Sequence, residues 1–193
     1  MSIIEKTALF IDYKNNEQYA RIRINEGIFV GINTFNLDNN PTGYMNVFFH
    51  PNKRLFLDTI YCYDQFRRYG LATLISELAD YILKDYEGYV IRGVYEPGQL
   101  STDRENNIER SQEELEMSAR KFYEKNEYKI IDYDEYSKNK YKYPYIIDDD
   151  FKLGEEETPR IVAKQITQKD YAFYEDEGVI YHHNYNRSNI RKK

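Results

Sequence analysis

Tryptophan is absent from the sequence, cysteine occurs once and proline only five times. The single cysteine, Cys62, excludes a disulfide within the chain and favours a reducing compartment such as the cytoplasm. No apolar run approaches the roughly 20 residues that cross a bilayer. The N-terminal segment also lacks the basic and long apolar regions of a secretory signal. The sequence therefore predicts a cytoplasmic protein with no membrane partner.

Basic residues are too few to balance the acids, since 27 Lys and Arg face 33 Asp and Glu, for a net charge of −6. This balance argues against nucleic acid as the main partner. With 193 residues, of which 41% are hydrophobic and 31% charged, the chain has an ordinary globular composition and the length for one domain with a real core. The 21 tyrosines are interpreted as compositional bias, and they must build much of that core.

The segment 55–86 organises the rest of the chain. Leu55–Tyr63 is apolar, aromatic and β-branched, which is typical of a strand, and Asp64–Gly70 is polar, basic and ends in glycine. From Leu71 the apolar residues recur in steps of three and four, which marks one face of an amphipathic helix. The sequence therefore predicts a strand, a tight basic turn, and a helix that begins at once.

This predicted turn suits a diphosphate. The first N–H groups of a helix lack partners within it, and the helix dipole adds partial positive charge there. Gly70 would let a phosphate approach the backbone, and Arg67 and Arg68 would add two full charges. A plain strand-to-helix turn with two solvated arginines explains the same residues, so the spacing alone leaves both interpretations open.

Outside this segment the sequence predicts mainly strands, with no helix before residue 70. Strands are expected at 7–11, 19–24, 28–32, 44–50, 89–95, 128–133 and 159–166. The strand 89–95 should run parallel to 55–63, with the helix as a right-handed crossover. A second helix is expected to begin after a Ser111 cap and to stop near Asn126.

Three further segments are predicted to lack regular structure or to have little of it. Residues 99–110 are polar and are expected to form a loop, either a lid or a locally disordered segment. Residues 134–158 are expected to form a long connection in which Asp148–Asp150 is a solvated turn. The tail from Thr167 has poor hydrophobic periodicity, and a helix is the only regular structure suggested for it.

Two motifs resemble those of a known family, the GNAT acetyltransferases. The acyl-coenzyme A loop of that family has Arg or Gln, two residues, Gly, one residue, then Gly or Ala, and residues 67–72 have the sequence RRYGLA. Its other recurrent segment has Ala, two residues, an apolar residue, Tyr, Glu and Lys, which residues 119–125 match. Glu96-Pro97 and Phe122-Tyr123 bring the chain closest to uncharacterised bacterial members. The resemblance covers roughly 55–166.

The resemblance implies an α/β (α+β) fold. The expected fold is a mixed, mostly antiparallel twisted sheet of about six to eight strands with two main helices. Its parallel central strand pair would be splayed at the coenzyme site. One acetyltransferase-like domain would span 1–166, with a C-terminal extension at 167–193. Within the domain, 1–53 would be the strand-rich N-terminal part, 54–133 the coenzyme-binding core and 134–166 a loop and the last strand.

The implied activity is acetyl transfer from acetyl-coenzyme A to the amine of a small molecule or peptide, by direct attack in a ternary complex and without a metal. The coenzyme-binding residues would be Tyr61, Cys62, Arg67, Arg68, Tyr69, Gly70, Leu71, Ala72 and Thr73. Tyr123 would protonate the departing thiolate. The general base is left open among Asp58, Glu96 and His50.

Each of these roles has an alternative. Tyr123 could be a core aromatic beside Phe122, Asp58 a buried hydrogen-bonded acid, and His50 an ordinary residue at a strand end. Because the helices that the family usually places after its first strand are not predicted, a fold-sharing sensor or interaction module that binds acyl-coenzyme A is the second functional hypothesis. A homodimer is left open as the assembly.

Overall fold

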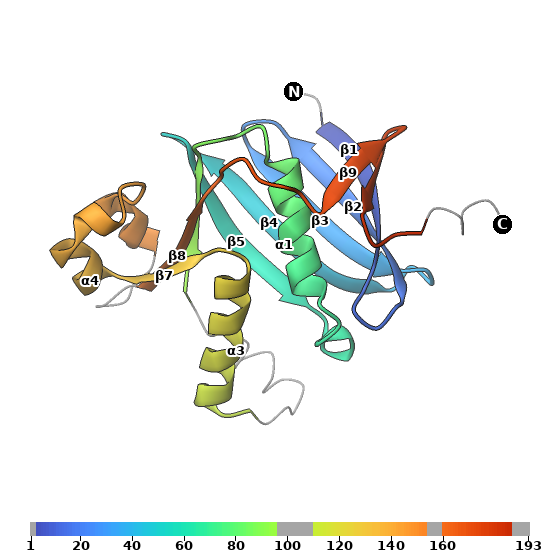
Figure 1. The fold of residues 1–193 in the computed structure, drawn as a ribbon, viewed down its shortest axis with the longest axis horizontal. Coiled ribbons are helices and arrows are strands. Elements are labelled where there is room, and N and C mark those ends of the chain that lie inside the picture. The colour runs from blue at the N-terminus through green and yellow to red at the C-terminus, as the bar shows by residue number, and fades with distance from the viewer. Residues whose placement is uncertain (1–2, 96–109, 154–159, 187–193) are drawn as a thin grey trace. The chain divides into compact units, whose positions relative to one another are not determined.

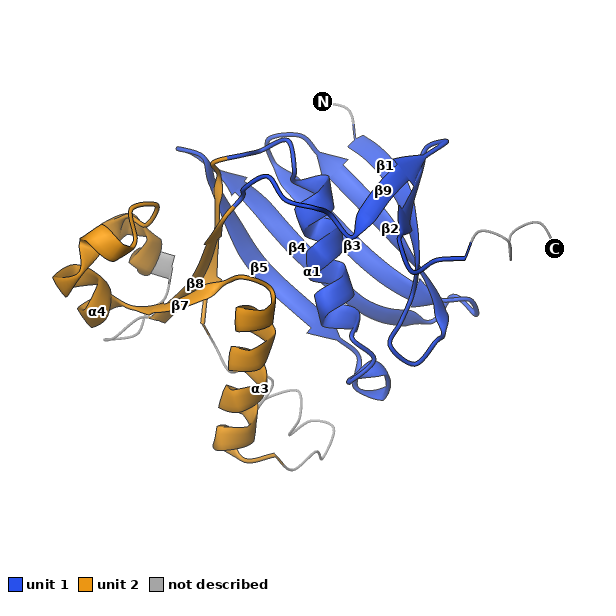
Figure 2. Cartoon of the chain, in the orientation of Figure 1, with its two compact units in different colours: residues 1–87, 166–193 blue, residues 88–165 orange. Residues whose placement is uncertain are grey.

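The computed structural model describes residues 3–95, 110–153 and 160–186. The chain divides into two compact units, residues 1–87 with 166–193 (unit 1) and residues 88–165 (unit 2), which Figure 2 distinguishes by colour. Within the described ranges, none of the helices combines the length and the apolar character that a bilayer crossing requires.

Unit 1 is built on a sheet with the strand order β5-β4-β3-β2-β1-β10-β9. Neighbouring strands are antiparallel except for the parallel pair β1 and β10. Helix α1 (Leu71–Ile82) contacts β3, β4, β5 and β9 and lies across one face of this sheet (Figure 1). The strands are β1 (Ile3–Ile11), β2 (Glu17–Asn25), β3 (Phe29–Asn36), β4 (Pro41–His50), β5 (Arg54–Cys62), β9 (Phe173–Asp176) and β10 (Val179–His182).

Helix α1 and the strands before it follow the predicted pattern. The four strands expected before residue 51 are present, and no α-helix precedes residue 70 among the described residues, where only the single 3-10 turn η1 (Asp64–Phe66) occurs. The apolar stripe of α1 is buried at steps of three and four, with Leu71, Leu74, Ile75 and Leu78 each at most 1% exposed. These predictions are confirmed.

The tail from Thr167 forms strands, so the suggested helix is wrong. Strands β9 and β10 make a hairpin through Glu177 and Gly178, whose φ angles of 49° and 80° are both positive. Two consecutive left-handed residues define the tight turn that joins antiparallel strands with their native twist. Strand β10 then pairs with β1, with Ala8 opposite Ile180.

Unit 2 contains a three-stranded antiparallel sheet in the order β7-β8-β6. Its strands are β6 (Val90–Val94), β7 (Lys129–Asp132) and β8 (Arg160–Gln165). Helix α3 (Gln112–Lys125) contacts β7. The connection after β7 is not structureless as expected, because it forms α4 (Tyr133–Lys138), η2 (Lys140–Lys142) and η3 (Asp148–Leu153).

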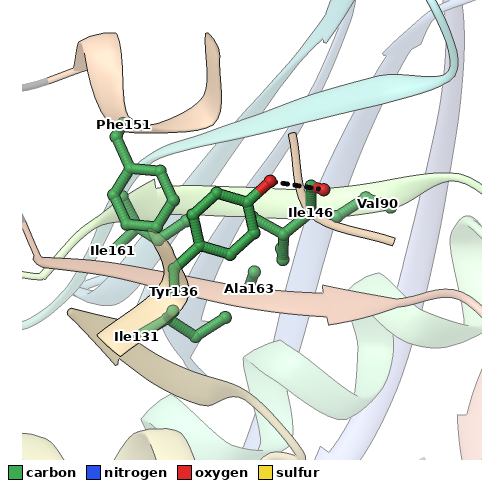
Figure 3. Close-up of a cluster of buried hydrophobic side chains, with 7 residues drawn as sticks. All are labelled: Val90, Ile131, Tyr136, Ile146, Phe151, Ile161 and Ala163. Atoms are coloured by element: carbon green, nitrogen blue, oxygen red, sulfur yellow. Dashed lines mark hydrogen bonds between the residues drawn. The ribbon is translucent and has the colours of Figure 1, made fainter. Parts of the chain in front are cut away.

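These short helices are held by a core of their own. Tyr136, Ile146 and Phe151 pack against apolar residues of the unit 2 strands, and the Tyr136 hydroxyl donates to the Ile146 carbonyl at 3.1 Å (Figure 3). Asp150 is fully buried, and one of its carboxylate oxygens lies 3.1 Å from Nε of Arg92. The expectation that Asp148–Asp150 is a solvated turn is therefore wrong at Asp150. Its apolar neighbours Ile146 and Phe151 pack in the core, and Asp150 is buried together with them.

The predicted fold class is confirmed in its main features. The described residues form a mixed, mostly antiparallel arrangement of ten strands, rather than six to eight, with α1 and α3 as the two main helices. The additional strands include β9 and β10. The parallel pairing of the 55–63 and 89–95 strands would join the two units and stays a prediction, as do the single domain at 1–166 and the extension. The loop at 99–110 lies almost entirely outside the described residues.

Candidate functional site

The bend between β5 and α1 has the geometry of an anion-binding helix start. Arg68 and Gly70 both adopt left-handed conformations, with φ angles of 64° and 74°. Gly70 is the N-cap of α1, no side chain caps this end, and no acidic residue lies in the first turn. The N–H groups of the first turn therefore have no acceptor within the helix and concentrate partial positive charge. The predicted strand, turn and helix are confirmed.

The two arginines of the bend differ in their surroundings. An Nη of Arg67 lies 2.5 Å from a carboxylate oxygen of Asp64, and both side chains are largely buried. Arg68 is exposed and makes no ion pair with any residue in the described part of the chain. The bend thus presents one uncompensated guanidinium to solvent, where the sequence suggested two.

Cys62 ends β5 directly behind the start of α1. Burial raises the pKa of its thiol to about 12, although the charge of Arg67 and the N–H of Ala72 act to lower it. A thiol with this pKa carries almost no thiolate at neutral pH, which argues against Cys62 as a nucleophile. Of the N–H groups in the first turn of α1, that of Ala72 points to the sulfur, and those of Leu71 and Thr73 have no acceptor inside the helix.

Gly70 has a neighbour that the sequence did not reveal. A Cβ atom built on Gly70 would lie 2.5 Å from Cγ of Tyr13, far inside contact distance. The backbone N–H of Tyr13 also donates to the Tyr69 carbonyl at 2.8 Å. The glycine is therefore required by its positive φ and by the ring of Tyr13, which occupies the side of the backbone that a phosphate was expected to approach.

Tyr61 precedes Cys62 in β5 and lies opposite Tyr44 of β4, with ring centroids 5.5 Å apart. Burial raises the pKa of Tyr61, and the carboxylate of Asp64 adds to this rise. The predicted pairing of the Tyr61 and Cys62 backbone with a pantetheine arm is not tested by these contacts and stays a prediction.

Asp58 stands at a β-bulge. The pairing of β4 with β5 shifts register between Asn46, which is opposite Thr59, and Val47, which is opposite Leu57, so Asp58 is the extra residue. Such bulges are common beside active sites because they re-aim a side chain. Asp58 is exposed and accepts a 2.9 Å hydrogen bond from the Thr59 hydroxyl, so the alternative of a buried acid is wrong.

The two other candidates for the general base give less information. His50 is the exposed last residue of β4, and its ring centroid lies 5.9 Å from that of Phe56. Glu96 lies outside the described residues. The structure therefore places two of the three candidates, Asp58 and His50, on the same unit as the Arg67–Thr73 bend.

Tyr123 lies in the last turns of α3, which is capped at both ends. Ser111 and Glu114 form a capping box at the start, as the serine cap predicted. At the end, Glu127 takes a left-handed conformation with φ 67°, and the Tyr128 N–H donates to the Tyr123 carbonyl at 2.9 Å. This is the hydrogen-bond pattern of a Schellman motif, so Glu127 performs the turn for which glycine is usual.

The Tyr123 side chain sits among aromatic rings of unit 2. Its ring centroid lies 5.8 Å from that of Tyr95, 5.1 Å from Phe122 and 5.6 Å from Tyr128. Such distances suit edge-on and tilted ring packing. Tyr123 is half-buried, so the described contacts are compatible with both the core role and the acid role that were left open.

Tyr95 is a second phenol of this cluster, and no sequence pattern predicted its role. Its hydroxyl donates to Glu116 at 3.0 Å, and the Arg160 guanidinium lies 4.8 Å from its ring centroid. Burial, followed by the hydrogen bond to Glu116, raises the pKa of Tyr95 to about 12. These contacts join the residue that follows β6 to α3 and β8, which is why no local pattern predicts them.

No protein-family model and no curated protein matches the chain. Among solved structures, an acetyltransferase of the GNAT family from Staphylococcus aureus Mu50 is 11% identical, with 73% of this chain and 70% of that chain covered and a TM-score of 0.48. The PaiA N-acetyltransferase from Thermoplasma acidophilum, in complex with coenzyme A, is 14% identical (72% and 61% covered, TM-score 0.42). The ribosomal-protein-S18-alanine N-acetyltransferase from Escherichia coli is 12% identical (78% and 77% covered, TM-score 0.43). All three of these neighbours are acetyltransferases, and each is at most 14% identical to this chain.

Proposed function

We propose that this protein binds acetyl-coenzyme A through the Arg67–Thr73 bend and transfers the acetyl group to the amine of a small molecule or peptide. The observation that carries this proposal is the open N-terminus of α1, with left-handed Gly70, no capping side chain and no acid in its first turn. A phosphate group is the ligand such a terminus prefers. Coenzyme A carries a diphosphate, and the sequence of the same bend resembles an acyl-coenzyme A loop.

The reaction needs a held thioester, a neutral amine and a proton for the departing thiolate. In the proposed step the amine nitrogen bonds to the acetyl carbon and the carbon–sulfur bond breaks. A backbone N–H near Tyr61 and Cys62 would polarise the thioester carbonyl. Tyr123 would give its proton to the sulfur, since a phenol of pKa about 10 is close in basicity to a thiolate.

The ammonium form of the acceptor must lose a proton before it attacks. Asp58, His50 and Glu96 remain the proposed candidates for this general base. Asp58 is favoured among the described two because the bulge sets its side chain apart from the regular alternation of β5. The expected partners are therefore acetyl-coenzyme A and an amine acceptor, with no metal.

A coenzyme-binding module without turnover is the second candidate. One observation favours it, which is that the bend and the residues that support it all lie in unit 1. Binding of a phosphate by the bend requires neither a general base nor a general acid. Asp58 and His50 are exposed, and neither is held by a charged partner among the described residues. Binding could therefore persist in a chain that does not catalyse transfer.

Turnover separates the two candidates. Wild-type protein is incubated with acetyl-coenzyme A and a panel of small amines and peptides, and thioester loss and acetylated product are measured together with coenzyme affinity by calorimetry. Acceptor-dependent loss supports the acetyltransferase. Binding without acceptor-dependent loss supports the module, and absence of binding to coenzyme A removes both.

A further inference from the structure

The turn between β1 and β2 supports the bend from an unexpected direction. Tyr13 of this turn donates its backbone N–H to the Tyr69 carbonyl at 2.8 Å. Its ring lies against Gly70, where the three nearest ring atoms would be 2.5 to 2.7 Å from a Cβ. One residue therefore fixes the peptide before the left-handed glycine and packs on the glycine itself.

The turn that carries Tyr13 is rigidly built. Asp12, which is 2% exposed, accepts backbone N–H groups from Lys14 at 2.8 Å and Asn16 at 3.0 Å. Its carboxylate also accepts from the side-chain amide of Gln18 at 3.0 Å. A short acid that receives several donors in this way holds a turn in one conformation.

The last residue of β1 is hydrogen-bonded by Asn184, which follows the C-terminal hairpin. The side-chain amide of Asn184 donates to the Ile11 carbonyl at 2.8 Å, and its oxygen accepts the Ile11 N–H at 3.3 Å. This side chain replaces a strand partner where β10 ends. The backbone immediately before Asp12 and Tyr13 is thus held by a segment more than 170 residues away in sequence.

We propose that Tyr13 is a positioning residue of the Arg67–Thr73 bend, which sets the direction in which the free N–H groups of α1 point. Its backbone bond orients the Tyr69–Gly70 peptide, and its ring leaves no room for a side chain at residue 70. It acts through Gly70 and not by contact with the phosphates. A binding site made of backbone N–H groups depends on such support, because their direction is fixed only by the surrounding chain. This role rests on the proposed function.

The test compares Tyr13→Ala, Tyr13→Phe and the matched control Tyr174→Ala. Tyr174 is another tyrosine of unit 1, less exposed than Tyr13, which is 53% exposed, and its ring stacks on Tyr181 and His183, away from the bend in sequence and contact. Coenzyme A affinity is measured by calorimetry, and inorganic pyrophosphate is titrated while the backbone amide resonances of Leu71 and Thr73 are followed.

Tyr13→Ala is expected to weaken coenzyme A binding by about tenfold, the size of loss seen when residues that orient bound metal ligands are removed. The Leu71 and Thr73 amides should respond less to pyrophosphate than in the wild type. Tyr13→Phe should retain wild-type affinity, because the ring and the backbone N–H remain. Tyr174→Ala should lose stability without losing affinity, and in the transfer assay Tyr13→Ala should raise the KM for acetyl-coenzyme A more than it lowers kcat.

A double variant isolates the ring contact. Gly70→Ala alone is destabilised both by the positive φ and by the collision of its Cβ with Tyr13. In the Tyr13→Ala background only the strain of the positive φ remains. The stability losses should therefore be less than additive.

The outcomes are separable. If wild-type protein binds coenzyme A and Tyr13→Ala binds it equally well, the role of Tyr13 is overturned while the proposed function stands. An equal loss of affinity in Tyr174→Ala overturns it as well, since general destabilisation then suffices. If the wild type binds neither coenzyme A nor pyrophosphate, the proposed function fails and this role fails with it.

Discussion

The two main helices begin in opposite ways. Helix α3 starts with Ser111 and Glu114 in a capping box and has acidic Glu113 and Glu114 in its first turn, so a capping side chain accepts the N–H of Glu114. Helix α1 starts with a left-handed Gly70, without a capping side chain and without an acid in its first turn. A capping side chain stabilises a helix by about 0.5 to 2 kcal/mol. The absence of one at α1 is the physical reason to expect a ligand there and not at α3.

The charges around the two helix starts also favour an anion at α1 and not at α3. Arg68 is exposed next to the start of α1, whereas the first turn of α3 is acidic and would repel an anion. Tyr13 of the β1–β2 turn packs against the start of α1. The start of α3, in contrast, is capped by Ser111, the residue next to it in the chain. An open start is therefore built from distant parts of the chain, and a closed start from neighbouring residues.

The largest effect is expected from Gly70→Glu. A side chain at residue 70 would collide with the Tyr13 ring and add a carboxylate beside the start of α1, and like charges in contact cost several kcal/mol, so coenzyme A affinity should fall by at least about 100-fold. Gly178→Glu is the matched control, because Gly178 has φ 80° with nothing within 4 Å of a Cβ. It introduces the same charge and backbone strain away from the bend. Calorimetry on both variants measures the difference, and an unchanged affinity in Gly70→Glu would rule out the bend as the coenzyme site.

A smaller effect, and on catalysis alone, is expected from Tyr123→Phe. Loss of a general acid lowers turnover by about 100-fold or more, whereas the phenyl ring keeps its packing with Tyr95 and Tyr128. Steady-state kinetics should show a reduced kcat with little change in coenzyme affinity. Phe122→Leu serves as the control for packing next to it, and a Tyr123→Phe enzyme of full activity would leave Tyr123 as a core aromatic.

Ser111→Ala sharpens the contrast between the two helix starts. Removing the cap should lower the free energy of unfolding by about 1 kcal/mol. Coenzyme affinity should stay at the wild-type value, because the start of α3 is not a ligand site in this account. Chemical denaturation and calorimetry on one preparation check both statements. A clear loss of affinity at unchanged stability would show that α3 also binds the coenzyme.

The smallest effect is expected at Cys62. Because burial raises the pKa of its thiol to about 12, iodoacetamide at pH 8 should leave the folded protein unmodified and label it only after unfolding. The same pKa shift determines how the free energy of unfolding changes with pH. The folded thiol keeps its proton after the unfolded one has lost it, so the stability that Cys62 contributes declines as pH rises from about 9 toward 12. Mass spectrometry detects the label, and rapid labelling of folded protein would show that Cys62 is accessible as thiolate.

Local signals predicted the parts of the fold that depend on neighbouring residues. The strand, turn and helix of residues 55–83 follow from hydrophobic periodicity and a glycine, and the start of α3 follows from Ser111 and its acids. The turn at Glu177-Gly178 carries a usable hairpin signal, and the weak periodicity around it led to the wrong prediction for the tail.

Contacts between distant segments could not be predicted in this way. Tyr13 meets Gly70, and Asp150 meets Arg92, only because segments far apart in sequence are brought side by side. Nothing in the residues around Asp150 distinguishes a buried acid from a solvated one. The candidate site was therefore predicted in its backbone geometry, while the supporting tyrosine became visible only in the structure. The ion pair of Arg67 with Asp64 is local, three residues apart, and was missed although both residues stand in the predicted turn.

The most direct measurement follows the backbone amide resonances of both helix starts while coenzyme A is added to the full-length protein. The account predicts that the amides of Leu71 and Thr73 shift with the coenzyme concentration and that those of Gln112 to Glu114 do not. Unmoved resonances at Leu71 and Thr73 in the presence of bound coenzyme would contradict it.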